Sequence, residues 1–249
     1  MHLSFSFPSL FLKKPHVQFS TRCNSPNRLR SHRSIPTSRI QMSAPTEDQI
    51  NSFVKFFDTQ VGQWKSNRTY HYLDPADPLA SEVERSQTVF RVTELDDSVK
   101  RKVLSDNERV DNLNFSAAGF RIVFDTVMEK RGNVSSGTNV LFLPMSVDND
   151  KIYGDYLRDV AYEESKAIIG KFSYNLINSE LEMITRYTKV TSKDSITMAN
   201  PNLRIRRILN YLNGTGDEEP QQLVLAGFGI EQRSDDDPDL KPTLNLNGT

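Results

Sequence analysis

Hydrophobic and polar positions follow two different rhythms along the chain. Between Pro45 and Val61 the apolar residues recur every three or four positions, which predicts one amphipathic helix. Thr46 is a suitable N-cap residue, with Gln49 three positions later as in a capping box. We expect this apolar stripe to pack on the body of the fold rather than on a membrane or a partner. Its members are Ile50, Phe53, Val54, Phe57 and Val61.

After Gly62 the apolar residues alternate with polar ones, in short runs separated by Gly, Asn, Asp and Pro. The strands predicted by this pattern lie near 63–73, 83–94, 99–105, 118–129, 138–147, 152–160, 167–175, 180–190, 194–199, 203–212 and 221–232. About ten strands at regular spacing, with one or two short helices, indicate an all-β fold. We predict a closed antiparallel up-and-down barrel, an architecture whose interior can hold one small ligand.

Both ends of the chain differ from the body in composition. No acidic residue precedes Glu47, and the segment before it is rich in Ser and Arg. Such a composition is typical of an organelle transit peptide, so residues 1–45 are predicted to be a plastid-targeting leader. A basic disordered tail is the alternative, and the apolar run 3–12 would fit a bipartite leader. Residues 46–233 are then the barrel, and 234–249 a disordered acidic tail.

Charge and composition exclude several classes of protein. Residues 47–249 carry a formal net charge of −8, which argues against binding to a nucleic-acid backbone. No apolar run is long enough to span a membrane. Cys23 lies in the leader, and His71 is the one histidine after it, so disulfide frameworks and Cys/His zinc sites are excluded from the body. We expect a binding function, with no metal and no cofactor.

A secreted lipocalin is a further alternative, because the chain contains five potential N-glycosylation sequons. They begin at Asn67, Asn114, Asn133, Asn213 and Asn247.

The first predicted strand places aromatic and basic side chains on one face. Its alternating set is Trp64, Ser66, Arg68, Tyr70 and Tyr72. An exposed face does not need three aromatic residues, and a dry core does not tolerate an unpaired guanidinium, whereas a ligand cavity accepts both. The Gly-x-Trp sequence at 62–64 has the form seen at the start of lipocalin-type barrels. Trp64 either plugs the closed end of the barrel or contacts the ligand.

Two arginines share a face of the strand near 203–212. Arg204 and Arg206 are two positions apart, so their side chains lie on the same side, separated by roughly 7 Å. That spacing suits a ligand with two carboxylates, each held by a guanidinium fork. The alternative is a pair of solvated arginines.

Two carboxylates interrupt predicted strands. Asp194 lies in the sequence Thr-Ser-Lys-Asp-Ser and is most simply a turn residue. Glu231 ends an alternating run that contains Gly227 and Gly229, and these glycines leave space on one face or allow close approach of neighbouring strands. Arginines and carboxylates in one barrel would form a polar pocket.

The body resembles the S-type phycobiliprotein lyases of the CpcS/CpeS family. The matching blocks are 56–57, 61–72, 119–124, 156–164, 191–196, 200–206 and 227–232. The resemblance implies a ten-stranded barrel like that of lipocalins and fatty-acid-binding proteins. It also implies binding of a free phycobilin, such as phycocyanobilin or phycoerythrobilin, as substrate. The bilin would then be transferred to a cysteine of an apo-phycobiliprotein subunit as a thioether.

The resemblance also implies roles for individual residues. The residues expected to contact the bilin are Arg68, Arg204, Arg206, Trp64 and Tyr70. The residues expected to be catalytic are Asp194 and Glu231. The alternative function is a non-enzymatic, calycin-type carrier of a bilin, a fatty acid or another small amphiphile. A homodimer stays an option.

Overall fold

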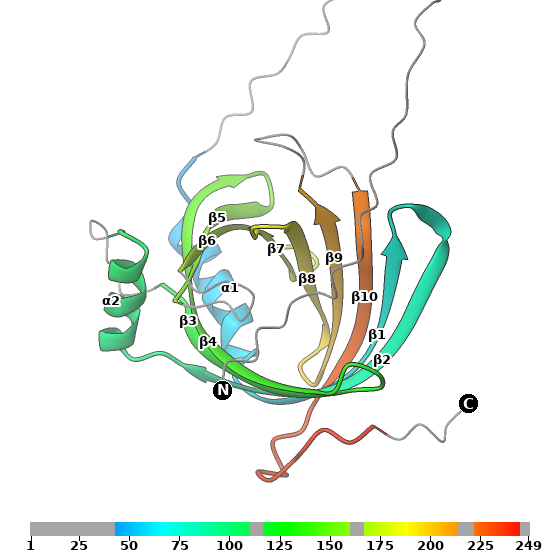
Figure 1. Ribbon diagram of the computed structural model, residues 1–249. Coiled ribbons are helices and arrows are strands. Elements are labelled where there is room, and N and C mark those ends of the chain that lie inside the picture. The colour runs from blue at the N-terminus through cyan, green and yellow to red at the C-terminus, as the bar shows by residue number, and fades with distance from the viewer. Residues whose placement is uncertain (1–42, 110–116, 160–166, 214–221, 245–249) are drawn as a thin grey trace, which may run out of the picture. The chain divides into compact units, whose positions relative to one another are not determined.

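Ten antiparallel strands form a closed barrel in the computed structural model (Figure 1). Residues 43–109, 117–159, 167–213 and 222–244 are described, so residues 1–42 of the predicted leader lie outside them. Each strand pairs with its neighbours in the chain, and β1 pairs with β10 to complete the barrel. The strands are β1 (Gly62–Asp74), β2 (Asp77–Glu94), β3 (Gly119–Met128), β4 (Asn133–Asp148), β5 (Lys151–Arg158), β6 (Ile168–Asn175), β7 (Glu180–Arg186), β8 (Val190–Asn200), β9 (Leu203–Leu212) and β10 (Gln222–Arg233). The predicted antiparallel barrel is confirmed.

The helix α1 (Glu47–Asp58) begins with the predicted capping box. Thr46 accepts a hydrogen bond from the backbone N–H of Gln49, whose side chain accepts one from the backbone of Thr46. One face of the helix buries three phenylalanines. Figure 1 shows the helix itself inside the curve of the sheet. The phenylalanines pack against aromatic side chains of the inner barrel face, so α1 fills part of the barrel interior. The aromatic residues of this cluster are Phe53, Phe56, Phe57, Trp64, Phe90, Phe120, Phe142, Tyr156, Phe172 and Tyr174.

The strand predicted near 99–105 is wrong, because this segment forms the helix α2 (Asp97–Asp106). Asp96 is its N-cap and accepts a hydrogen bond from the backbone N–H of Val99. Val103 and Leu104 are buried in a second apolar cluster on the outer face of the sheet. Figure 1 shows α2 outside the barrel, whereas α1 lies inside the curve of the sheet.

Strand alternation separates an inner from an outer set of side chains. On β1 the inner set contains Trp64 and Ser66, both with no exposed surface, while the intervening Lys65 and the following Asn67 lie on the outer face. Antiparallel register extends this division to the neighbouring strands, because directly paired residues share a face. Glu231 of β10 pairs with Ser66 and therefore belongs to the inner set.

The segment after β10 runs along the barrel wall as far as residue 244. The side chain of Gln63 donates hydrogen bonds to the carbonyl oxygens of Ser234 and Asp237. Arg91 donates to the carbonyl oxygen of Leu240, 2.8 Å away. These contacts give residues 234–240 a fixed path on the barrel, which differs from the disorder predicted from their composition. Neither helix of the described part is long and apolar enough to cross a membrane.

Candidate functional site

A fully buried carboxylate organises the polar side chains inside the barrel. Glu231 has no exposed surface. One of its carboxylate oxygens accepts a hydrogen bond from Nε of Arg204 at 2.5 Å, and the other accepts from Nη2 of Arg68 at 2.9 Å. The hydroxyl of Ser66 donates to the same carboxylate at 3.0 Å. Strands β1, β9 and β10 therefore meet at one carboxylate.

Opposite charges keep this buried carboxylate ionised. Burial alone would raise the pKa of Glu231, but the guanidinium groups of Arg204, Arg68 and Arg206 outweigh burial and lower it below its ordinary value. Burial lowers the pKa of Arg204, with Glu231 acting in the opposite direction. An ion pair of this kind persists in a dry interior because each charge is hydrogen-bonded.

Arg204 belongs to the enclosed end of the site. Its guanidinium lies 4.1 Å from the centre of the Trp64 ring, and its Nη1 donates to Oε1 of Gln60 at 2.7 Å. The indole N–H of Trp64 donates to the carbonyl oxygen of Gln60. Arg204 is 3% exposed and Trp64 is 0% exposed, so the interpretation of Arg204 as a solvated surface residue is wrong. Trp64 is thus buried against Arg204, in agreement with the interpretation of Trp64 as a plug.

A second ion pair lies beside this group and is more accessible. Both carboxylate oxygens of Asp194 accept hydrogen bonds from the guanidinium of Arg206, one of them at 2.9 Å from Nε. The side chains of Arg206 and Asp194 are 20% and 17% exposed. Asp194 lies within β8, so its interpretation as a turn residue is wrong. Burial lowers the pKa of Arg206, but Asp194 outweighs this effect and raises it.

Two glycines of β10 make room for the side chains of β1. Gly229 pairs with Arg68 on one side and with Arg206 on the other, and Gly227 pairs with Tyr70. A Cβ atom at Gly229 would lie 3.0 Å from Cγ of Arg68, and one at Gly227 would lie 2.7 Å from the Tyr70 ring. The absence of side chains here lets Arg68 lie across β10, where its Nη1 donates to the Tyr70 hydroxyl at 3.1 Å.

The five charged side chains of this interior group have a formal excess of one positive charge. They are Arg68, Arg204, Arg206, Asp194 and Glu231, and we refer to them as the interior charge cluster. An excess guanidinium in a largely buried setting favours a ligand with carboxylate groups. Within the described ranges, no group of three or more His, Cys, Asp or Glu is placed to hold a metal ion.

Sequence reasoning missed a further polar group on the inner face of β2. Glu84 is fully buried and accepts hydrogen bonds from the backbone N–H groups of Lys130 and Arg131, in the turn between β3 and β4. The guanidinium of Arg131 forms an ion pair with Glu84 and lies 3.8 Å from the centre of the Tyr72 ring. Burial is the main reason that the pKa of Tyr72 rises to about 12. Only the inward position of Tyr72 was predictable from alternation.

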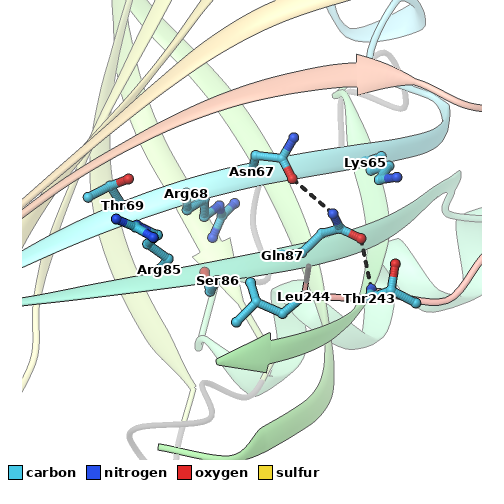
Figure 2. Close-up of a pocket in the computed structure, with 9 residues that line it drawn as sticks. All are labelled: Lys65, Asn67, Arg68, Thr69, Arg85, Ser86, Gln87, Thr243 and Leu244. Atoms are coloured by element: carbon cyan, nitrogen blue, oxygen red, sulfur yellow. Dashed lines mark hydrogen bonds between the residues drawn. The ribbon is translucent and has the colours of Figure 1, made fainter. Parts of the chain in front are cut away.

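A separate hollow of about 310 Å³ lies on the outer face of β1 and β2 (Figure 2). Its outward-facing lining includes Lys65, Asn67 and Gln87, and Thr243 of the segment after β10 also lines it. Figure 2 shows the two hydrogen bonds that join Gln87 to Asn67 and to the backbone N–H of Thr243. The lining also includes Arg68, a member of the interior charge cluster, and Ser86, so the hollow borders the cluster between β1 and β2.

The fold and the interior charge cluster together define the class of protein: a closed antiparallel β-barrel built around an enclosed, arginine-rich site. A family model described as CpeS-like protein matches residues 52–234. The chain belongs to this CpcS/CpeS family, and its role is that of a lyase. The matched residues include every member of the interior charge cluster.

Named relatives and a solved structure agree with this assignment. "Chromophore lyase CpcS/CpeS 1" from a Synechococcus species is 40% identical over 74% of this chain and 97% of its own length. "Chromophore lyase CpcS/CpeS" from Thermosynechococcus vestitus is 29% identical over 61% of this chain and 79% of its own. The solved S-type phycobiliprotein lyase CPES from Guillardia theta has the same fold, with a TM-score of 0.55 at 18% identity, covering 76% of this chain and 98% of that structure.

Proposed function

We propose that this protein binds a free phycobilin non-covalently inside the barrel and transfers it to a cysteine of an apo-phycobiliprotein subunit. The observation that carries the proposal is the interior charge cluster, in which three arginines face two carboxylates inside a closed barrel. A linear tetrapyrrole with two propionates complements such a site, because guanidinium groups bind carboxylates through paired hydrogen bonds. The family membership agrees with this ligand class.

The two ion pairs of the cluster suit different tasks in this proposal. Arg206 and Asp194 keep partly exposed side chains, so they can exchange their mutual hydrogen bonds for contacts with a ligand. Arg206 would bind a propionate, and the freed Asp194 carboxylate would accept N–H groups of the pyrrole rings. Arg204 and Glu231 are enclosed by protein and would hold Arg68 and the strand arrangement in place.

The transfer step needs a thiol that this protein does not supply. Cys23 is the one cysteine of the chain, and it lies in the predicted leader. The acceptor thiolate would add to the side group of ring A, forming a C–S bond while a proton is taken up by the bilin. This addition has no leaving group and no change of redox state. The barrel would contribute by holding the bilin in one extended shape.

A titration with a matched pair of arginine variants tests the binding site. Arg206 points into the barrel, whereas the next residue, Arg207, lies on the outer face with a 57% exposed side chain. We expect Arg206→Ala to weaken phycocyanobilin binding about tenfold or more, because it removes a charge-assisted contact. Arg207→Ala should bind like the wild type. Absorbance titration of the free bilin measures both, and equal affinity of all three proteins would refute the proposed site.

For localisation, we propose that residues 1–45 direct the protein to a plastid, on the basis of their basic, acid-free, serine-rich composition. A fusion of these residues to a fluorescent protein, expressed in an alga with plastids, tests this directly. Plastid fluorescence is the expected result, and diffuse or secreted fluorescence would contradict it.

A further inference from the structure

Two buried polar atoms of the barrel interior have no hydrogen-bond partner among the residues that the structure describes. They are Oγ of Ser86 and Oδ1 of Asn210. Ser86 is 2% exposed and Asn210 is 8% exposed. A buried polar atom without a partner lowers the stability of a fold, so its presence in a ligand-binding protein needs an explanation.

Both side chains lie on the inner face of the barrel. Ser86 of β2 pairs directly with Arg68 of β1, and Figure 2 shows the two residues on these adjacent strands. Asn210 follows Arg206 by four positions on β9, so it shares the inward face of Arg204 and Arg206.

Strand register places both atoms beside the interior charge cluster. Ser86, Arg68, Gly229 and Arg206 form one continuous row of paired residues across four strands. Glu231 pairs with Arg204, and Asn210 lies three inward positions beyond Arg204 along β9. The two unpartnered atoms therefore lie at the level of Arg206 or beyond it, away from the enclosed Trp64 end.

The chemistry of the two atoms restricts the ligand. Oδ1 of Asn210 is an acceptor and needs an N–H or O–H donor, and the hydroxyl of Ser86 can donate to a carbonyl oxygen. A fatty-acid carboxylate offers no donor and would leave Asn210 unpaired. A linear tetrapyrrole offers pyrrole and lactam N–H donors together with lactam carbonyl oxygens.

We propose that Asn210 and Ser86 are ligand-contact residues, in which Asn210 accepts an N–H of the bound tetrapyrrole and Ser86 donates to one of its lactam oxygens. This inference rests on the proposed function. The two residues select for a ligand with both donors and acceptors, whereas the arginines select for carboxylates. Each unpartnered atom destabilises the empty barrel and gains its partner when the ligand binds.

The variant Asn210→Leu tests this inference, because leucine has the same number and branching of side-chain heavy atoms and no polar atoms. We expect phycocyanobilin to bind about tenfold more weakly, since the variant leaves a buried N–H of the ligand unpaired. The ligand-free variant should unfold at the same temperature as the wild type or at a higher one, because the unpartnered oxygen is gone. Ser86→Ala should show the same two effects.

Two controls separate ligand contact from a general structural effect. Arg85→Ala changes the exposed, outward-facing neighbour of Ser86 and should alter neither affinity nor melting temperature. Oleate serves as a second probe, and its affinity should not fall in Asn210→Leu, because it has no donor for the amide oxygen.

Three results of these measurements would overturn the inference, and each has a different meaning. Bilin affinity of Asn210→Leu within about twofold of the wild type would show that Oδ1 serves no ligand. A lower melting temperature of the ligand-free variant would show a structural role instead, such as binding of an internal water. If the wild type itself fails to bind phycocyanobilin, the proposed function falls, and this inference falls with it.

Discussion

At the scale of single residues, the interior charge cluster depends on Glu231. This carboxylate is fully buried and shared by Arg204 and Arg68, so two cations are neutralised mainly by one anion. A buried ion pair adds little net stability compared with apolar packing, but removal of one partner leaves the other charges uncompensated. Glu231 is therefore the residue of the cluster on which stability depends most.

The substitution Glu231→Gln should destabilise the protein by about 3–5 kcal/mol, because both guanidinium groups lose their counter-charge in a dry environment. Chemical denaturation measures this difference. Glu94→Gln, which changes an exposed carboxylate at the end of β2, is the control and should leave the unfolding free energy unchanged. A loss of equal size in the two variants would contradict the role given to Glu231.

The lowered pKa of the Glu231 carboxylate predicts how the stability of the protein depends on pH. The pKa of Glu231 in the folded protein lies below its ordinary value of 4.5, so the ion pairs contribute fully above that value. The contribution declines as the pH falls from there toward the folded-state pKa. Denaturation of the wild type and of Glu231→Gln at about pH 3 and pH 7 should show a smaller difference at the lower pH. A constant difference would show that Glu231 does not titrate in this way.

Alternation along the strands predicted much of the site but little of its pairing. The inward set of β1 and the shared face of Arg204 and Arg206 follow from a period of two. The partner of each arginine does not, because pairing across strands depends on register, which local sequence leaves open. The polar residues around Asp194 indicated a turn instead of a strand, and nothing in the sequence indicated a role for Gln60.

At the scale of elements, β10 shows why glycines occur in the middle of a strand. Gly227 and Gly229 lie on the inner face, where side chains of β1 cross them to reach the interior. The sequence had indicated free space or close approach at these positions, and the structure shows that neighbouring side chains occupy the space. The positions of Arg68 and Tyr70 thus depend on the absence of side chains at Gly229 and Gly227 of β10.

The substitution Gly227→Ala should displace the Tyr70 ring, because the added Cβ would lie 2.7 Å from it. We expect a loss of about 1–3 kcal/mol in stability, as for overpacking of a core, together with weaker bilin binding. Gly137→Ala in β4 is the matched control, since its Cβ would approach no atom closer than 3.4 Å. Denaturation and absorbance titration test both variants, and an unaffected Gly227→Ala protein would show that Tyr70 is not held by close approach.

The helix α2 was the one element whose type was predicted wrongly. Val99 and Val103 are four positions apart, a spacing that places them on one face of a strand and equally on one face of a helix. The Asp96 cap and burial of Leu104 against the outer sheet face decide in favour of the helix. Short segments with both periods are ambiguous until their tertiary contacts are known.

At the scale of the whole molecule, the sequence predicted the barrel because its signal is repeated in every strand. Regular spacing and alternation indicated a closed antiparallel meander, and the register confirms one. Contacts between segments that are far apart in the chain could not be predicted from the sequence. The path of residues 234–240 along the wall depends on Gln63 and Arg91, which lie far from them in the sequence.

We propose that the barrel delivers a bilin to another protein and does not only carry it. The most direct test of this transfer is incubation of residues 46–249 with phycocyanobilin and an apo-phycobiliprotein subunit, followed by denaturing electrophoresis and zinc-enhanced fluorescence. We expect a fluorescent band at the mass of the acceptor subunit, far stronger than in a reaction without the lyase and absent when the acceptor cysteine is replaced. A protein that binds bilin but produces no such band would be a carrier, and that result would refute the proposed transfer.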